Sequence, residues 1–205
     1  MMRTGRPRQF DRDEAVIGAM HLFWEKGYDA TSLAQLKASI GKGITAPSFY
    51  AAFGSKEALF NEAVSCYLKT HARVTEPLWD PALPPRQALE TALLNSARMQ
   101  YGAGHPRGCM VALSVMSACS EETRPILKPL EESRRRTREG IGHCVKRGIA
   151  SGELQDTAHT PALAVSFDSF LLGISTLARD GIPLADTERA IAQMMRLWDV
   201  SRVTP

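Results

Sequence analysis

The 205-residue sequence predicts an all-α protein. Apolar residues recur three and four positions apart through most of the chain, which is the spacing of one face of a helix. Gly and Pro fall at the breaks between these segments, and the β-branched runs that favour strands are few. The segments together predict about nine helices and no strand.

The first predicted helix begins at Asp11 and ends at Gly27. Asp11 is followed three positions later by Glu14, which is the spacing of a capping box. Val16 and Met20, four positions apart, then begin an apolar stripe that should be buried.

Two short helices and the beginning of a third come next, in the outline of a helix-turn-helix. Ser32 followed by Gln35 forms another capping box, and this helix stops at Gly41. Thr45 caps the second short helix. Pro47 lies in its first turn, where a proline loses no helical hydrogen bond.

The outer face of the second short helix suits a DNA groove. Phe49 and Phe53 are four apart and should face the core, so small and hydroxyl-bearing residues remain outside. Ser55 caps the next helix, and Lys56 then occupies a position where the helix dipole disfavours a cation. A docked DNA phosphate would remove that conflict. The alternative interpretation is a solvated Lys56 and a half-buried Tyr50.

The candidate DNA-binding residues combine this face with the preceding turn, the first cap and an arginine-rich arm. The arm carries Gly-Arg-Pro-Arg with no apolar residue to anchor it, and such arms insert arginines into narrow minor grooves. A tail with incidental charge is the alternative. The candidates are Arg6, Arg8, Ser32, Lys42, Thr45, Ala46, Pro47, Ser48, Tyr50 and Lys56.

Three runs in this region resemble the N-terminal domain of the TetR family of bacterial transcription regulators: GRPRQFDRDEAV, LFWEKGYDATSL and GITAPSFYAAFGSKEALFNEAV. The resemblance covers about residues 5–65 and is carried by G-Y-x-A-T-S-L followed by S-F-Y-x-x-F-x-S-K. One departure is that Gly41, Lys42 and Gly43 stand where the family commonly has a single Gly. The turn should therefore be longer, with Lys42 either adding a phosphate contact or remaining solvated.

The rest of the chain continues the helical pattern. Pro125 and Pro129 leave the beginning of one long helix open, because the second would kink an established helix. Further helices are expected at residues 56–75, 85–101, 108–118, 124–151, 160–179 and 184–198. The expected domains are a flexible basic arm at 1–10, a helix-turn-helix DNA-binding domain at 11–56, and an effector-binding and dimerisation domain at 57–205.

The last two helices carry more apolar surface than one small domain readily covers. A homodimer that pairs them as a four-helix bundle would bury it, and the resemblance implies dimerisation of this kind. Ordinary core helices of a monomer are the alternative. The candidate interface residues are Phe170, Ile174, Leu177, Ile191, Met195 and Trp198.

The resemblance also implies a small-molecule pocket in the C-terminal domain, whose occupation releases the DNA. Residues 106–111, and later Gly173 with residues 178–181, are loosely similar to the branch typified by the copper outer membrane regulator. Apolar side chains with a few polar tips are the candidate lining, with plain core as the alternative. They are Met99, Tyr101, His105, Cys109, Met110, Met116, Phe167 and Phe170.

Composition bounds the remaining possibilities. The net charge is only +3, so DNA affinity must come from local placement of Arg and Lys. We expect no membrane partner, because no apolar run approaches the length of a bilayer span and no export signal is present. Four cysteines without close pairing fit a reducing, cytoplasmic location.

Other function classes have weaker support in the sequence. Cys109 and Cys119 would lie about 15 Å apart on one helix and could not share a metal ion. No catalytic motif, metal site or cofactor is expected. The predicted function is a homodimeric repressor on a palindromic double-stranded operator, released by a small-molecule effector. The alternatives are a thiol- or metal-responsive regulator of the same fold, or a helical enzyme or binding protein.

Overall fold

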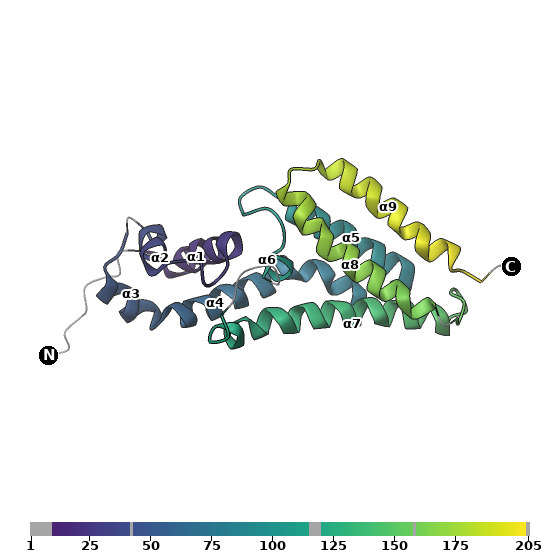
Figure 1. The fold of residues 1–205 in the computed structure, drawn as a ribbon, viewed down its shortest axis with the longest axis horizontal. Helices are drawn as coiled ribbons and strands as arrows, with labels where there is room; N and C mark the ends of the chain where they lie inside the picture. Colours follow the sequence, from purple (N-terminus) through teal and green to yellow (C-terminus); the bar gives the residue numbers. More distant parts are fainter. Residues whose placement is uncertain (1–9, 42, 115–119, 158, 204–205) are drawn as a thin grey trace.

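The computed structural model of the chain is elongated, with helices α1 to α3 at one end and the end of α9 at the other (Figure 1). The structure describes residues 10–41, 43–114, 120–157 and 159–203. These ranges contain nine α-helices, two 3-10 helices and no strand, apart from an isolated bridge between Leu154 and Arg202. The predicted all-α fold is confirmed.

The N-terminal helices begin at the predicted caps. The Asp11 side chain accepts hydrogen bonds from the backbone N–H groups of Asp13 and Glu14, and Ser32 and Gln35 form the reciprocal capping box. Because each cap satisfies backbone donors at a helix start, the sequence locates these starts well. The helices are α1 Arg12–Lys26, α2 Leu33–Ser39, α3 Ala46–Phe53 and α4 Lys56–Lys69.

Aromatic rings fill the core of this N-terminal module. The ring of Phe23 meets that of Phe60 edge-on with centroids 5.0 Å apart, and Trp24 meets Tyr67 in the same way at 4.8 Å. Phe60 and Tyr67 both belong to α4, which also contacts the first 3-10 helix and α7 of the body. Helix α4 is therefore shared, and the domain boundary between residues 56 and 57 stays a prediction.

The body begins with a correction to the predicted helix at 56–75, because α4 ends at Lys69. The Thr70 hydroxyl donates to the carbonyl of Cys66 at 2.7 Å, which satisfies one of the terminal carbonyl groups. A 3-10 helix, η1, follows over His71–Trp79. The later elements are α5 Pro85–Gln100, α6 Met110–Leu113, η2 Arg124–Leu127, α7 Lys128–Ala150, α8 Thr160–Arg179 and α9 Leu184–Val200.

Two more boundaries differ from expectation. The helix predicted over 108–118 is the single turn α6, and residues 115–119 lie outside the described part of the chain. The long helix predicted from 124 starts as the 3-10 turn η2, and α7 begins at Lys128 with Pro129 in its first turn, where proline is compatible with a helix.

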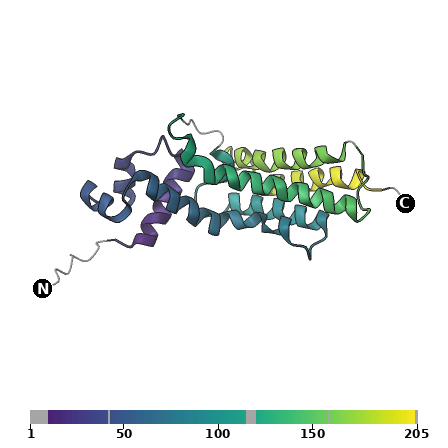
Figure 2. The same cartoon turned by 90° about the horizontal axis from the view of Figure 1, so that it is seen from below.

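Four long helices, α5, α7, α8 and α9, run alongside one another in the body (Figure 2). Their shared core is largely alkyl, built around Leu89, Ile141 and Phe167. Gly148 of α7 leaves room for Trp198 of α9, because a Cβ atom there would lie 2.9 Å from Trp198 Cζ2.

This packing corrects part of the predicted dimer interface. Ile174, Ile191, Met195 and Trp198 are at most 1% exposed within a single chain. They point into the protomer's own core, because α8 and α9 turn their apolar stripes toward α5 and α7. These four residues therefore cannot contact a second copy, whereas Phe170 and Leu177 are only half-buried.

Helix α8 has more apolar residues than the protomer buries. Its window Ala162–Arg179 has a mean hydropathy of 1.3 and is only 33% buried, so by length and composition alone it could cross a bilayer. The expectation that no apolar run reaches that length is therefore wrong. Since α8 also packs on α5, α7 and α9, its uncovered side is a free face of a bundle helix.

Candidate functional site

Helix α3 presents a polar outer face on a rigid apolar base. Phe49 is fully buried and Phe53 is 4% exposed, as their spacing predicts. On the opposite side the Tyr50 ring is 51% exposed, and it meets the Phe49 ring edge-on at 5.7 Å. Pro47 and Ser48 are exposed as well. The buried phenylalanines thus fix the position of α3, and its outer face is exposed to solvent.

Hydroxyl groups cap α3 at its start. Thr45 Oγ1 accepts from the Ser48 backbone N–H at 3.4 Å and lies 3.0 Å from the Ser48 hydroxyl. Thr45 is exposed and Ala46 half-buried, so both stand beside the free face. Ser32 is also exposed, but it lies at the start of α2 and its hydroxyl is engaged in the capping box.

The longer turn between α2 and α3 depends on glycine. Gly41 has φ 56° and Gly43 has φ 91°, a left-handed region that other residues rarely adopt. The Gly43 N–H donates to the Ile40 carbonyl at 2.8 Å, and the Ile44 N–H donates to the Lys37 carbonyl at 3.0 Å. These two backbone hydrogen bonds close the turn. Lys42, like Arg6 and Arg8 of the arm, lies outside the described residues.

Lys56 has a partner that the sequence did not indicate. Its Nζ lies 4.3 Å from the centroid of the Tyr28 ring, within the range of a cation–π interaction. Burial lowers the pKa of Lys56, and the nearby Asp29 acts in the opposite direction. The conflict with the helix dipole is thus eased in part within the chain, and the half-buried ammonium remains beside the Ser55 cap.

Arg179, in the last turn of α8, joins the body to the N-terminal module. Its guanidinium donates to the carbonyls of Trp24 at 2.9 Å and Glu25 at 3.2 Å, both in the last turn of α1. A third N–H reaches the carbonyl of Arg107 at 3.3 Å, in the loop before α6. A cation at a helix C-terminus is favourable. The fold shows that Arg179, although it belongs to α8, interacts with the C-terminal carbonyls of α1.

A cluster of imidazoles surrounds Trp24 at the same junction. The His105 ring stacks on the indole with centroids 4.7 Å apart, and His71 approaches it at 5.1 Å. His21 lies 6.4 Å away on α1. Burial lowers the pKa of both His21 and His71, and the neighbouring His105 lowers each further.

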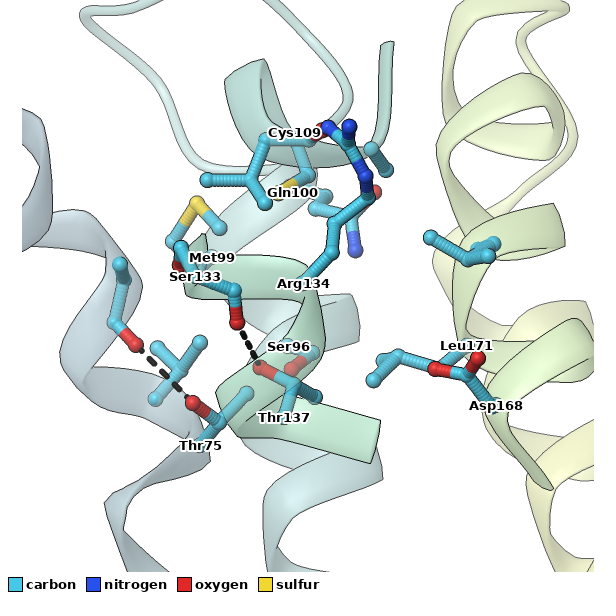
Figure 3. Close-up of a pocket in the computed structure, with 15 residues that line it drawn as sticks. Thr75, Ser96, Met99, Gln100, Cys109, Ser133, Arg134, Thr137, Asp168 and Leu171 are labelled. Atoms are coloured by element: carbon cyan, nitrogen blue, oxygen red, sulfur yellow. Dashed lines mark hydrogen bonds between the residues drawn. The ribbon is translucent and has the colours of Figure 1, made fainter. Parts of the chain in front are cut away.

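A small cavity of about 50 Å³ lies in the body among η1, α5, α6, α7 and α8 (Figure 3). Its walls mix alkyl groups with hydroxyl, amide and charged groups, which is typical of ligand pockets. The lining residues are Ala72, Val74, Thr75, Ser96, Met99, Gln100, Cys109, Val111, Ala112, Ser133, Arg134, Thr137, Asp168, Leu171 and Leu172.

Two of the predicted pocket residues, Met99 and Cys109, line this cavity. The Tyr101 hydroxyl instead bonds Thr187 Oγ1 at 2.8 Å, and His105 stacks on Trp24. The other described candidates, Met110, Phe167 and Phe170, pack in or against the two hydrophobic cores, because they occupy other faces of their helices. Met116 lies outside the described residues.

The polar groups of the cavity that were missed come from η1, α5, α7 and α8, and the charged ones lie on α7 and α8. Arg134 donates through Nη1 to the Val111 carbonyl and to Ser114 Oγ, both at 2.7 Å. Asp168 is only 7% exposed and accepts from Arg138 Nε at 2.7 Å. No motif indicated these groups, and the run of arginines at 134–136 is the sequence signal that could have located the charge.

Cys109 lies in the cavity wall, where its thiol contacts Tyr67. The Tyr67 hydroxyl donates to its sulfur at 3.2 Å, and burial raises the pKa of the Cys109 thiol. A raised pKa disfavours the reactive thiolate. Within the described ranges, no group of three or more His, Cys, Asp or Glu side chains is placed to hold a metal ion.

A helix-turn-helix with a free polar face, mounted on a helical body with an internal cavity, is the arrangement of a DNA-binding transcriptional regulator. The sequence profile of bacterial regulatory proteins of the tetR family matches residues 17–63. The HTH-type transcriptional repressor ComR of Escherichia coli is 30% identical over 195 residues, which cover 95% of this chain and 91% of ComR. BdcR, also an HTH-type transcriptional repressor of E. coli, is 37% identical over 113 residues, covering 55% and 56% of the two chains.

A solved structure of the TetR family regulator CifR, a cysteine mutant complexed with 26-bp double-strand operator DNA, superposes with a TM-score of 0.82. It is 34% identical, and the match covers 95% of this chain and all of that one. The chain therefore belongs to the TetR family of bacterial regulatory proteins. Its relatives are transcriptional regulators and not enzymes.

Proposed function

We propose that this protein is a homodimeric repressor that binds a palindromic operator through α3 and leaves it when a small effector binds the body. The observation that carries the proposal is the exposed outer face of α3, fixed from behind by Phe49 and Phe53. The operator complex of the similar regulator CifR supports the same use of this module. We place the protein in the cytoplasm, where operator DNA is found.

We assign the DNA contacts according to the chemistry of each side chain. Small and hydroxyl-bearing residues of α3, together with Tyr50, enter the major groove, where they meet base edges and backbone oxygens. Lys56 and the N–H groups that begin α4 face a phosphate, as does Ser32 at the start of α2. Arg6, Arg8 and Lys42 add minor-groove and phosphate contacts from the arm and the turn.

A second copy of the chain covers the free side of α8 and α9. Val165 is 65% exposed, and Ser169 and Thr176 continue its stripe at helical spacing. On α9, Leu197 is 39% and Val200 76% exposed. These residues replace the four core residues of the predicted interface, whereas Phe170 and Leu177 stay at its edge. Two α3 helices then reach successive major grooves.

The effector occupies the cavity and acts on the segment between the cavity and α1. That segment, residues 107–114, is tied to α7 by Arg134, to α4 by the bond from Tyr67 to Cys109, and to α8 by Arg179. A displacement of α6 therefore reaches two helices of the DNA-binding module. A thiol-responsive mechanism has less support, because the pKa of Cys109 is raised.

A gel shift with DNA from upstream of the protein's own gene tests this proposal. We expect a discrete complex with that DNA and only weak binding to a scrambled duplex of equal length. Because non-specific binding falls steeply with salt, the comparison belongs at about 150 mM salt. Equal affinity for the two duplexes would reject the proposal.

A further inference from the structure

Arg134 is a charged group in the cavity wall with only neutral acceptors. Its bonds to the Val111 carbonyl and the Ser114 hydroxyl both use Nη1. Among the described residues, no Asp or Glu forms an ion pair with it. Burial lowers the pKa of Arg134, so the protein already destabilises the charged form there. The N–H groups at Nε and Nη2 form no hydrogen bond to another described residue, and neither is enclosed away from solvent.

The other charges near the cavity do not balance Arg134. Asp168 is the acidic group of the lining, and its carboxylate is paired with Arg138 at 2.7 Å. Glu131, nearly one turn earlier on α7, raises the pKa of Arg134, but it is exposed to solvent, which screens its charge, and it forms no ion pair with Arg134. The cavity therefore keeps an excess of one positive charge beside a wall of alkyl and neutral polar groups.

The wall opposite the guanidinium limits the size and polarity of a ligand. Val74 contributes an alkyl group to the lining. Met99 and Leu171 contribute alkyl groups as well, and Ser96 and Thr137 contribute hydroxyls (Figure 3). The free volume is only about 50 Å³, which suits a compact molecule with one charged end. A carboxylate can accept from two parallel N–H groups of a guanidinium at once, and it is small enough to leave room for an alkyl chain.

We propose that the cavity binds a small organic monocarboxylate, which pairs with the free edge of Arg134 and places a short alkyl chain against Met99 and Leu171. This inference rests on the proposed function, because it names the chemical class of the effector. Pairing of this kind neutralises a half-buried charge, and the alkyl contact adds the burial of a few methylene groups.

The same pairing explains how the ligand would act on α6. Arg134 holds the last turn of α6 through Val111 and Ser114, and α6 in turn contacts α1. A carboxylate that draws the guanidinium into the cavity competes with those two bonds. By linkage, a ligand that weakens operator binding must bind the DNA-free protein more tightly than the DNA-bound protein.

The experiment uses the full chain without DNA and a matched set of small molecules. Acetate, butyrate and hexanoate are titrated by calorimetry, with butyramide and butylamine as the neutral and cationic counterparts of butyrate. We expect binding of at least one carboxylate and no saturable binding of the amide or the amine. Arg134→Gln should weaken that binding by about tenfold or more, because charge-assisted pairs are strong. Arg135→Gln, on the solvent side of the same helix, should not change it.

Absence of binding by all three carboxylates, or equal binding of butyrate and butyramide, would overturn the inference. Unchanged affinity in Arg134→Gln would overturn it as well. Should that variant fail to fold, the wild-type comparison of butyrate with butyramide still decides. The gel shift is read separately: operator binding without carboxylate binding rejects this inference alone, and carboxylate binding without operator binding rejects the proposed function alone.

Discussion

The two halves of the molecule are stabilised by different kinds of core. The N-terminal module packs rings against rings, with Phe23, Tyr28 and Phe60 in mutual contact at centroid distances of 5.0 to 6.0 Å. The body packs alkyl groups between long helices and leaves a cavity with polar walls. Interlocked rings have few alternative arrangements, whereas polar side chains around a cavity can exchange partners.

In the proposed function, the N-terminal module binds DNA and the body binds the effector. The module presents α3 as a rigid unit, and the body contains the groups that a ligand can rearrange. Arg179 joins the two halves through three carbonyls, two in α1 and one before α6. A change in the body therefore reaches the position of the module without altering its interior.

The largest effect is expected from a charge in the core of the body. Met195→Glu should unfold the protomer, at a cost of about 4 kcal/mol or more, because a fully buried side chain would become an unpaired carboxylate. Urea unfolding followed by circular dichroism measures the cost. Gln193→Glu, exposed on the same helix, is the control. A stable, folded Met195→Glu protein would contradict the placement of this helix face in the protomer core.

A charge on the free face of α8 should have a different result. Val165→Glu should leave each protomer folded and split the dimer, because two carboxylates would meet across the interface. Sedimentation equilibrium measures the dissociation. Ile17→Glu, an exposed apolar residue on α1, should leave the dimer intact. If Val165→Glu dimerises as tightly as wild type, another face of the body forms the interface.

The salt dependence of operator binding distinguishes the expected contacts of Lys56 and Tyr50. Lys56→Ala should weaken operator binding and lower the salt slope of log affinity by about 0.9, because one phosphate charge is no longer neutralised. Tyr50→Phe should weaken binding without changing that slope, since a phenol releases no counterion. Fluorescence anisotropy at several salt concentrations measures both. An unchanged affinity in both variants would remove Lys56 and Tyr50 from the interface.

The smallest effect concerns the imidazoles at the junction. The pKa values of His21 and His71 are lowered from the ordinary 6.5, first by burial and then by His105. In the unfolded chain these groups bind more protons. Their contribution to stability is therefore fully present above pH 6.5 and is lost as the pH falls from that value through the lowered pKa values of the folded state. Stability should therefore decline on mild acidification.

Thermal unfolding across this pH range measures the decline. His71→Gln should flatten the dependence, because one of the two shifted groups is removed. His159→Gln, exposed at the start of α8, is the control. A wild-type stability that does not change between pH 7.5 and about 5.5 would contradict the burial of these imidazoles.

Local features allowed most of the N-terminal module to be predicted. Caps such as Ser32 with Gln35, and the four-residue spacing of Phe49 and Phe53, depend on neighbours within one turn of helix. The partner of Lys56 was missed because Tyr28 lies far away in sequence and meets it only in the folded module.

The body was predicted less well, because its contacts join distant segments. Periodicity showed that α8 and α9 have apolar stripes, but not which stripe faces the protomer core; Trp198 proved to be internal. The cavity wall likewise depends on Arg134 meeting Val111 across two elements. Residue type favoured Met, Phe and Tyr as pocket residues, whereas the cavity is polar at several points of its wall.

The stoichiometry of the operator complex tests the central claim most directly. Mass photometry or sedimentation of the protein with its upstream palindromic DNA counts the copies bound. The account predicts two protomers per palindrome, and a Val165→Glu variant that binds a half-site weakly and loses affinity for the full palindrome. A single wild-type copy that binds the full operator tightly would contradict a dimeric reader built on α3, α8 and α9.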